Sequence, residues 1–235
     1  MQGSTLRRPM VDPLEIFPRG LTKLNSLWIS KTYPFASIGK KVSFHYTSRM
    51  YRPRAPRIRI GNFCSLREYA WLNIPTDEYV GEPIIVLEDN CHIGFGSIVS
   101  ARNLIHLERD VLVGQMVLII DHNHSYEDIS APIVGQGIDG NGTIHIGQGT
   151  WIGHGAAIIS PRRNLTIGHN CVIAANSVVM RSIPDYSVVA GYPATIIRQF
   201  DPQTGKWRMG RGESKPTPRT AEDDVHVTTT VHEPA

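Results

Sequence analysis

Residues 146–179 read IGQGTWIGHGAAIISPRRNLTIGHNCVIAANSVV, and this stretch decides the fold. An aliphatic residue returns every six positions, often followed by Gly, and a small residue stands four places after it. A period of six does not fit an amphipathic helix or a hairpin ladder. It does fit a short strand and a tight corner repeated around a prism. Three such sides make one coil of about 18 residues.

The same six-residue block extends outward over most of the chain. Aliphatic residues begin the blocks at Ile60, Leu66, Leu87, Ile93, Leu107, Val113, Ile146, Ile152, Ile167 and Ile173, with a weaker pair at Ile38 and Phe44. The small position holds Cys64, Ala70, Cys91, Ser97, Val111, Val117, Thr150, Ala156, Cys171 and Ser177. We expect the aliphatic side chain to stack inward, the small one to fit at the corner, and the Gly to ease the backbone there. All three cysteines hold the small position, which favours packing over a reactive role.

The composition indicates one main domain. The chain has 235 residues and a formal net charge of +3, with Lys and Arg scattered along its length, so no basic stripe points to a nucleic-acid partner. No apolar run approaches the roughly 18 residues of a membrane span. The cysteines form no CxxC pair, which argues against a disulfide framework or a zinc ribbon. These features predict a soluble, cytoplasmic protein.

The repeat divides the chain into three parts. Residues 1–36 form an N-terminal extension, residues 37–198 form the expected β-helix catalytic domain, and residues 199–235 form a polar tail. The tail is rich in Pro and has no aliphatic period, so we expect disorder from about residue 210.

Segments outside the repeat carry local predictions. A short helix that packs on the first coil is predicted by the spacing of Leu21, Leu24, Leu27 and Trp28 before Pro34. Proline and charge mark residues 51–57 and 74–83 as loops that leave the prism. The longest interruption, residues 121–143, is polar and rich in Gly. Long excursions from a rigid scaffold often carry function.

The hexapeptide pattern resembles that of the left-handed parallel β-helix acyltransferases. This family includes galactoside, maltose and nodulation-factor acetyltransferases and bacterial polysaccharide O-acetyltransferases, and the resemblance covers about residues 58–198. The resemblance implies the left-handed turn of the coil, because general packing rules favour right-handed crossovers. It also implies acetyl-CoA as acyl donor and a homotrimer with active sites between subunits.

Asp121, His122, Asn123 and His124 stand where a coil ends and the long excursion begins. Acetyl transfer to a hydroxyl needs a general base with a pKa near neutrality, which histidine provides. The resemblance puts the family's catalytic histidine at His124, with His122 as second choice. A carboxylate such as Asp121 or Glu127 would orient the ring by accepting its other N–H.

The C-terminal blocks resemble the part of the family that binds the acyl donor. The resemblance puts Trp151, Gly153 and His154 near the thiol end of the cofactor, Ala174 along its pantetheine arm, and Arg181, Pro193 and Arg198 near its nucleotide end. Two departures affect this placement. Residues 159–165 are longer than the Leu-Pro-Gly-Val of most relatives, and Thr195 stands where some relatives have a basic residue.

For the acceptor we expect contacts from Arg102, Asn103 and Asp121, because residues 100–103 fall on the coil beneath the histidines. The predicted reaction is direct transfer of acetyl to a hydroxyl of a sugar or polysaccharide precursor in a ternary complex. A backbone N–H from residues 152–155 is the expected oxyanion donor.

Three other functions stay open. One is a nucleotide-sugar N-acetyltransferase, and another is a non-catalytic β-helix scaffold. The third is a zinc hydratase, because the prism also resembles that of the gamma-class carbonic anhydrases, which hold zinc with histidines. No spacing here requires a metal, and none is expected. Histidines beside the coils are His92, His106, His145, His154 and His169.

Overall fold

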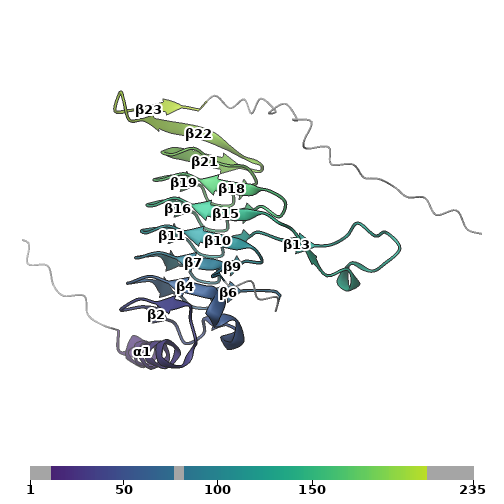
Figure 1. The fold of residues 1–235 in the computed structure, drawn as a ribbon. Coiled ribbons are helices and arrows are strands. Elements are labelled where there is room, and N and C mark those ends of the chain that lie inside the picture. Colours follow the sequence, from purple (N-terminus) through teal and green to yellow (C-terminus); the bar gives the residue numbers. More distant parts are fainter. Residues whose placement is uncertain (1–11, 77–81, 211–235) are drawn as a thin grey trace, which may run out of the picture.

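A computed structural model describes residues 12–76 and 82–210. Three parallel sheets form the sides of a prism along which the chain climbs coil by coil (Figure 1). Sheet A contains β1 (Ser37–Ile38), β4 (Ile58–Ile60), β7 (Ile85–Leu87), β10 (Leu104–Leu107), β15 (Thr143–Ile146) and β18 (Asn164–Ile167).

Sheets B and C complete each coil. Sheet B begins with β2 (Ser43–Phe44), β5 (Ser65–Leu66), β8 (His92–Ile93), β11 (Leu112–Val113), β16 (Trp151–Ile152) and β19 (Val172–Ile173). Sheet C contains β3 (Arg49–Met50), β6 (Trp71–Asn73), β9 (Ile98–Ser100), β12 (Leu118–Ile120), β17 (Ala157–Ile159) and β20 (Val178–Val179). Strands from successive coils pair in register, so that Leu107 lies between Leu87 and Ile146.

The six-residue pattern becomes the core, as predicted. The aliphatic residue that opens each strong block is buried, and so is the small residue four places later. Each strand is so short that only one or two side chains point inward, which explains the period. The cysteines fit this scheme, because all three are free and buried. Burial raises the pKa of the Cys171 thiol, which disfavours the reactive thiolate.

The glycines that directly follow the aliphatic residue serve close packing, and our expectation that they ease the backbone at the corner was wrong. A Cβ on Gly94 would lie 2.1 Å from the carbonyl oxygen of Gly114 in the next coil. The left-handed conformation at the corners falls two places further on, on Gly96 (φ 64°) and Gly149 (φ 70°) in some coils and on Asn90 (φ 59°) and Met116 (φ 56°) in others. Where Gly follows the aliphatic residue, as at Gly94, the next coil lies too close for a side chain.

The predicted N-terminal helix is α1 (Pro13–Thr32), which covers the first coil (Figure 1). The Asp12 side chain caps its start by accepting from the N–H of Leu14 at 2.9 Å. The helix ends at Thr32, two residues before Pro34, as predicted. Among the described residues, no helix is long and apolar enough to span a membrane.

Changes in coil length occur at the C–A edge of the prism, where the chain passes from sheet C to sheet A. The 3₁₀ helix η1 (Arg52–Arg57) lies there, as do residues 74–84, of which 77–81 are outside the described residues. The long excursion also leaves from this edge (Figure 1). It contains the antiparallel pair β13 (Asn123–His124) and β14 (Ile138–Asp139) and the 3₁₀ helix η2 (Ile133–Gly135).

Ordered structure continues beyond the expected domain end at Arg198. Sheet B is extended by β21 (Ser187–Gly191), β22 (Ala194–Asp201) and β23 (Lys206–Met209), the last two of which are antiparallel to their neighbours. The rings of Phe200 and Trp207 lie 5.5 Å apart, and the Arg198 guanidinium lies 5.0 Å from the Trp207 ring centre. The six-residue period stops here, so the repeat gave no signal for this hairpin. Residues 211–235 lie outside the described residues.

Candidate active site

Asp121 lies at the edge where the long excursion begins, directly after β12. Its side chain is fully buried and accepts from the backbone N–H groups of Arg102 (2.7 Å), Asn103 (2.8 Å) and Leu104 (2.9 Å) in the preceding connection. These donors are in place because the turn into β10 passes beneath β12. A carboxylate with three N–H donors is held in one orientation.

His122 completes a pair with this carboxylate. Its Nδ1 lies 2.9 Å from Oδ1 of Asp121, and the residue is 6% exposed. Because the carboxylate only accepts, Nδ1 carries the proton that it donates, and the neutral ring has its free lone pair on Nε2. A nearly buried imidazole with a fixed tautomer is the geometry of a general base.

His124 is placed differently. It lies on β13, beside Ile138 of β14, and is exposed to solvent. Across residues 12–76 and 82–210, no side chain or carbonyl makes a hydrogen bond with its ring. Glu127, the other carboxylate considered for orienting a histidine, forms an ion pair with Arg162. Of the two histidines, only His122 has an orienting partner.

Arg102 and Asn103, expected to contact the acceptor, hold the base of the excursion. The guanidinium of Arg102 donates to the carbonyl of Gly140, and the Asn103 amide donates to the carbonyls of Gly140 (3.2 Å) and Gly142 (3.0 Å). Asp121 is buried with protein donors on both oxygens, so no acceptor can reach it. These contacts give all three residues a structural role.

Sequence reasoning missed Gly140. This residue has φ 128°, and a Cβ there would lie 2.5 Å from the Pro161 carbonyl oxygen and 3.1 Å from the His122 Cα. Only glycine leaves room for the backbone after β14 to pass close to His122. The glycines of segment 137–142 indicated that the backbone there needs unusual conformations or close contacts. Nothing in the sequence linked Gly140 to His122.

Asn73 and Ser100 line the edge below the pair. Ser100 lies in register between Asn73 and Ile120, and its hydroxyl accepts from the Asn73 amide at 2.8 Å. Ser100 belonged to the predicted acceptor coil, but Asn73 was not singled out. The two side chains bring polar groups to the edge where the base is located.

The residues predicted to bind the acyl donor are distributed over the upper coils. Gly153 is buried beneath Ala174, and its N–H donates to the Ile173 carbonyl at 2.7 Å. Trp151 and His154 are exposed beside it. Arg181 follows β20, while Pro193 and Arg198 belong to the C-terminal hairpin, and all three are exposed. The structure therefore brings Trp151, Gly153, His154 and Ala174 together at the B–C edge, where the chain passes from sheet B to sheet C. His122 lies at a different edge, the C–A edge.

Two of the backbone N–H groups at residues 152–155, expected to stabilise the oxyanion, already donate to carbonyls within the chain. The N–H of Gly153 donates to Ile173, and that of Gly155 donates to Gln115 at 2.9 Å. Both groups stabilise the stacking of coils. No described residue accepts from the N–H of His154, which leaves this group as the candidate from that turn.

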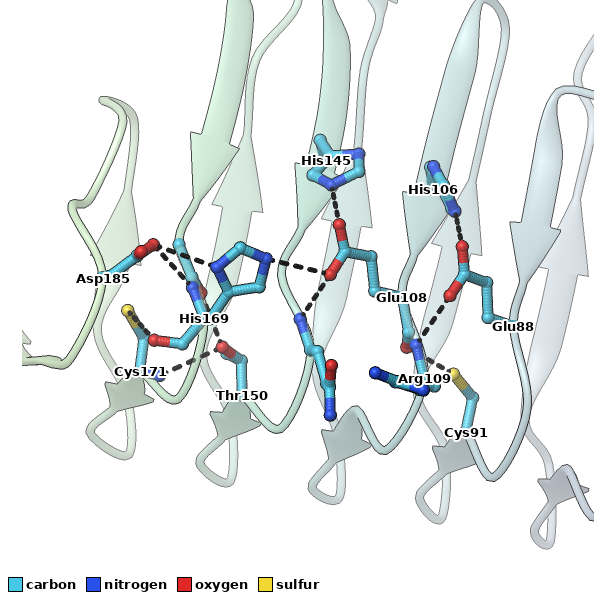
Figure 2. Close-up of polar contacts among 12 residues, drawn as sticks. Glu88, Cys91, His106, Glu108, Arg109, His145, Thr150, His169, Cys171 and Asp185 are labelled. Atoms are coloured by element: carbon cyan, nitrogen blue, oxygen red, sulfur yellow. Dashed lines mark hydrogen bonds and ion pairs between the residues drawn. The ribbon is translucent and has the colours of Figure 1, made fainter.

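The histidines of sheet A pair with carboxylates from neighbouring coils (Figure 2). His106 Nε2 lies 2.9 Å from Glu88, and His145 Nε2 lies 2.7 Å from Glu108. His169 lies 3.2 Å from Glu108 on one side and 3.4 Å from Asp185 on the other. In the described parts of the chain, no group of three or more His, Cys, Asp or Glu side chains is arranged to hold a metal ion. These pairs brace successive coils.

Glu108 is expected to stabilise the fold in a pH-dependent way. Burial alone would raise its pKa, but hydrogen bonds from His145 and from the Gln148 N–H outweigh burial and lower the pKa below 4.5. The stabilisation is therefore complete above pH 4.5 and is lost as the pH falls through the lowered value. Glu108→Gln should reduce the free energy of unfolding by about 1 kcal/mol at pH 7, and by clearly less at pH 3, as measured by urea unfolding.

The exposed carboxylate Glu127 provides the control for this measurement. Glu127→Gln removes an ion pair at the surface, so it should change the free energy of unfolding little at either pH. An equal loss for Glu108→Gln at pH 7 and pH 3 would contradict a role that depends on its charge.

Comparison with known proteins finds acetyltransferases. No protein-family model matches the chain. It is 32% identical over 139 residues to "Probable acetyltransferase Rv3034c" of Mycobacterium tuberculosis, covering 56% of this chain and 45% of that protein. It is 31% identical over 133 residues to "Putative lipopolysaccharide biosynthesis O-acetyl transferase WbbJ" of Escherichia coli, covering 54% and 66%. The chain thus spans less than two thirds of these relatives.

Among solved structures, the chain is similar to AntD, an N-acyltransferase from Bacillus cereus in complex with dTDP and 3-hydroxybutyryl-CoA. The TM-score is 0.60 at 16% identity, over 77% of this chain and 90% of AntD. At this identity the likeness concerns the fold, and it confirms the predicted left-handed parallel β-helix. The chain therefore has a six-residue period, the left-handed β-helix fold of AntD and sequence similarity to acetyltransferases, as the hexapeptide-repeat resemblance implies.

Proposed function

We propose that the chain transfers an acetyl group from acetyl-CoA to a hydroxyl of a sugar or glycan precursor, with His122 as the general base. The observation that carries this proposal is the Asp121–His122 pair at the edge of the long excursion. This proposal ranks His122 before His124, whereas the sequence ranked His124 first. Asp121 is a positioning residue that fixes the tautomer of His122.

The proposed step moves one proton and one acyl group. Nε2 of His122 accepts the proton of the acceptor hydroxyl while the oxygen attacks the thioester carbonyl carbon. The new C–O bond forms, the C–S bond breaks, and the CoA thiolate leaves and is protonated by the imidazolium. The donor and acceptor are held together, so the reaction becomes effectively unimolecular.

The names of the relatives support the class of reaction. WbbJ is described as an O-acetyl transfer enzyme of lipopolysaccharide biosynthesis, and AntD was solved with a CoA thioester and with dTDP. We assign the acyl donor to the surface formed by Trp151, Gly153, His154 and Ala174, and the nucleotide end to Arg181, Pro193 and Arg198. The small residues Gly153 and Ala174 leave room for an extended arm, and the arginines suit phosphate groups.

The active site is proposed to form between subunits of a homotrimer. His122 lies on the C–A edge and the donor surface lies on the B–C edge, with the face of sheet C between them. That face is apolar and in register from coil to coil: Trp71, Ile98, Leu118, Ala157 and Val178. A neighbouring copy that covers sheet C would bring its own donor surface toward His122.

The oligomeric state follows as a prediction. The purified chain should have three times its 26.2 kDa mass in light scattering after gel filtration. Leu118→Glu places a charge in the middle of the apolar face and should lower the mass to that of one chain. Thr166→Glu, on the polar face of sheet A, is the control and should leave the trimer intact. A trimer that survives Leu118→Glu would place the interface elsewhere.

The function itself is tested by a screen that follows thiol release from acetyl-CoA over free sugars, oligosaccharides and nucleotide sugars. An O-acetyl product is an ester that mild alkali removes, whereas an N-acetyl product is an amide that survives. We expect an alkali-labile product. A stable product on an amino sugar nucleotide would instead support the N-acetyltransferase, and no turnover with any hydroxyl acceptor would overturn the proposal.

A further inference from the structure

Helix α1 contacts the prism through the polar residues Asn25 and Ser26 and through the buried Ile29. Ser26 donates its hydroxyl to the Thr22 carbonyl and accepts from the backbone N–H of Phe44 at 2.8 Å. Asn25 donates its amide to the carbonyls of Phe44 (3.1 Å) and His45 (3.3 Å). These contacts satisfy the open backbone edge of the first coil, which has no coil below it.

Several other large apolar side chains of α1 remain exposed. Phe17 is 73% exposed, Leu24 is 66% exposed, and Leu27 and Trp28 are each 54% exposed. Their spacing of 3, 4 and 7 places them on one stripe of the helix, whereas Ser26 and the buried Ile29 lie on the side toward the prism. Single exposed apolar side chains are common, but a contiguous stripe of large ones marks an interaction surface.

Positive charge and a groove accompany this stripe. Lys23 and Lys31 on the helix and Lys40 and Lys41 on the first coil are exposed. A groove of about 630 Å³ runs between the helix and that coil. Its walls include Leu24, Leu27 and Val42, with Lys23 and Lys41 also lining it. The groove thus offers an apolar interior with ammonium groups beside it.

We propose that α1 is an interfacial helix that docks this end of the prism on an anionic lipid surface. The Phe17–Trp28 stripe would enter the acyl boundary of the bilayer, and the lysines would contact lipid phosphates. The helix lies across the end of the prism, away from β13 of the long excursion (Figure 1), so docking leaves the excursion free. This inference does not depend on the proposed acyl transfer.

Charge favours a lipid surface over a second copy of the same face. A two-fold contact between two α1 stripes would bring Lys23 and Lys31 of one copy against the same residues of the other, and like charges repel at such an interface. An anionic bilayer offers an apolar interior and negative headgroups in the same plane. It therefore matches both properties of the surface.

The test is co-sedimentation of the full chain with large vesicles of phosphatidylcholine alone and of phosphatidylcholine with phosphatidylglycerol, about 3:1 by mole. We expect binding to the anionic vesicles that weakens in high salt. Leu24→Glu with Trp28→Glu should lower the partition coefficient at least about tenfold. Both side chains are exposed, so the circular dichroism spectrum should stay unchanged.

Two further variants keep the test decisive. Ile129→Glu with Val134→Glu places the same charges on exposed apolar positions of the long excursion and should leave vesicle binding unchanged. Lys23→Glu with Lys31→Glu should weaken binding while all apolar side chains of α1 are kept. Absence of binding to anionic vesicles would overturn the proposal, and so would binding that the Leu24 and Trp28 changes leave intact. Loss of oligomer mass in that variant, with no vesicle binding by the parent chain, would assign the stripe to contact between copies.

Discussion

Replacing His122 by alanine is expected to lower kcat for acetyl transfer by about 10²–10⁴-fold, the range for loss of a general base. The variant keeps its fold, because the core consists of the stacked aliphatic columns and His122 lies outside them. Binding of acetyl-CoA should change little, since the proposed donor surface is on another edge. The measurement is steady-state thiol release, with the KM for acetyl-CoA determined in the same assay.

His124→Ala is the matched control, two residues away on the same excursion. Its ring is exposed and has no orienting carboxylate, so kcat should stay close to that of the parent chain. The reverse result, a large loss for His124 and a small one for His122, would return the catalytic role to the residue that the sequence favoured. Equal small losses would remove both from catalysis.

Asp121→Asn is expected to lower kcat by about 10²-fold or more, because the change removes the acceptor that fixes the His122 tautomer. The amide has only one acceptor oxygen, whereas Asp121 uses both oxygens to accept N–H groups of Arg102, Asn103 and Leu104. A donor would face a donor at this buried site, at a cost of about 1–3 kcal/mol in the free energy of unfolding.

The two effects of Asp121→Asn are separated by measuring both quantities. Unfolding in urea measures the structural cost. The pH profile of kcat measures the effect on His122, and it would stay unchanged if Asp121 had a purely structural role. Glu127→Gln, at the other carboxylate considered for orientation, should alter neither. Full activity in a folded Asp121→Asn chain would show that His122 needs no carboxylate partner.

The fold was readable from the sequence because each coil repeats the same short-range rule. Ile60, Cys64 and Leu66 are buried for the same reason as Ile167, Cys171 and Ile173, so one stretch predicts the others. The C-terminal hairpin was not readable in this way. Its pairing of Phe200 with Trp207 follows the alternation of an antiparallel ladder, and the six-residue period contains no information about it.

The candidate site was only partly readable, because its geometry depends on contacts between distant segments. The sequence identified the segment that contains Asp121, His122 and His124. It did not show which of the two histidines, only two residues apart, would be buried. That decision comes from the pairing of Asn123 with Asp139 and from donors nearly twenty residues earlier in the chain. The role of Gly140 beside His122 likewise appears only when the excursion returns.

The single edge at which coil length changes has a consequence for how such a protein diversifies. At the other two edges the connections between strands keep the same length from coil to coil, as in residues 88–91 and 108–111, so an added residue there would shift the register of the coils that follow. At the C–A edge, segments as different as residues 101–103 and the long excursion connect the same two sheets. Insertions and deletions are therefore tolerated where the acceptor is proposed to bind, and specificity can diverge while the core is preserved.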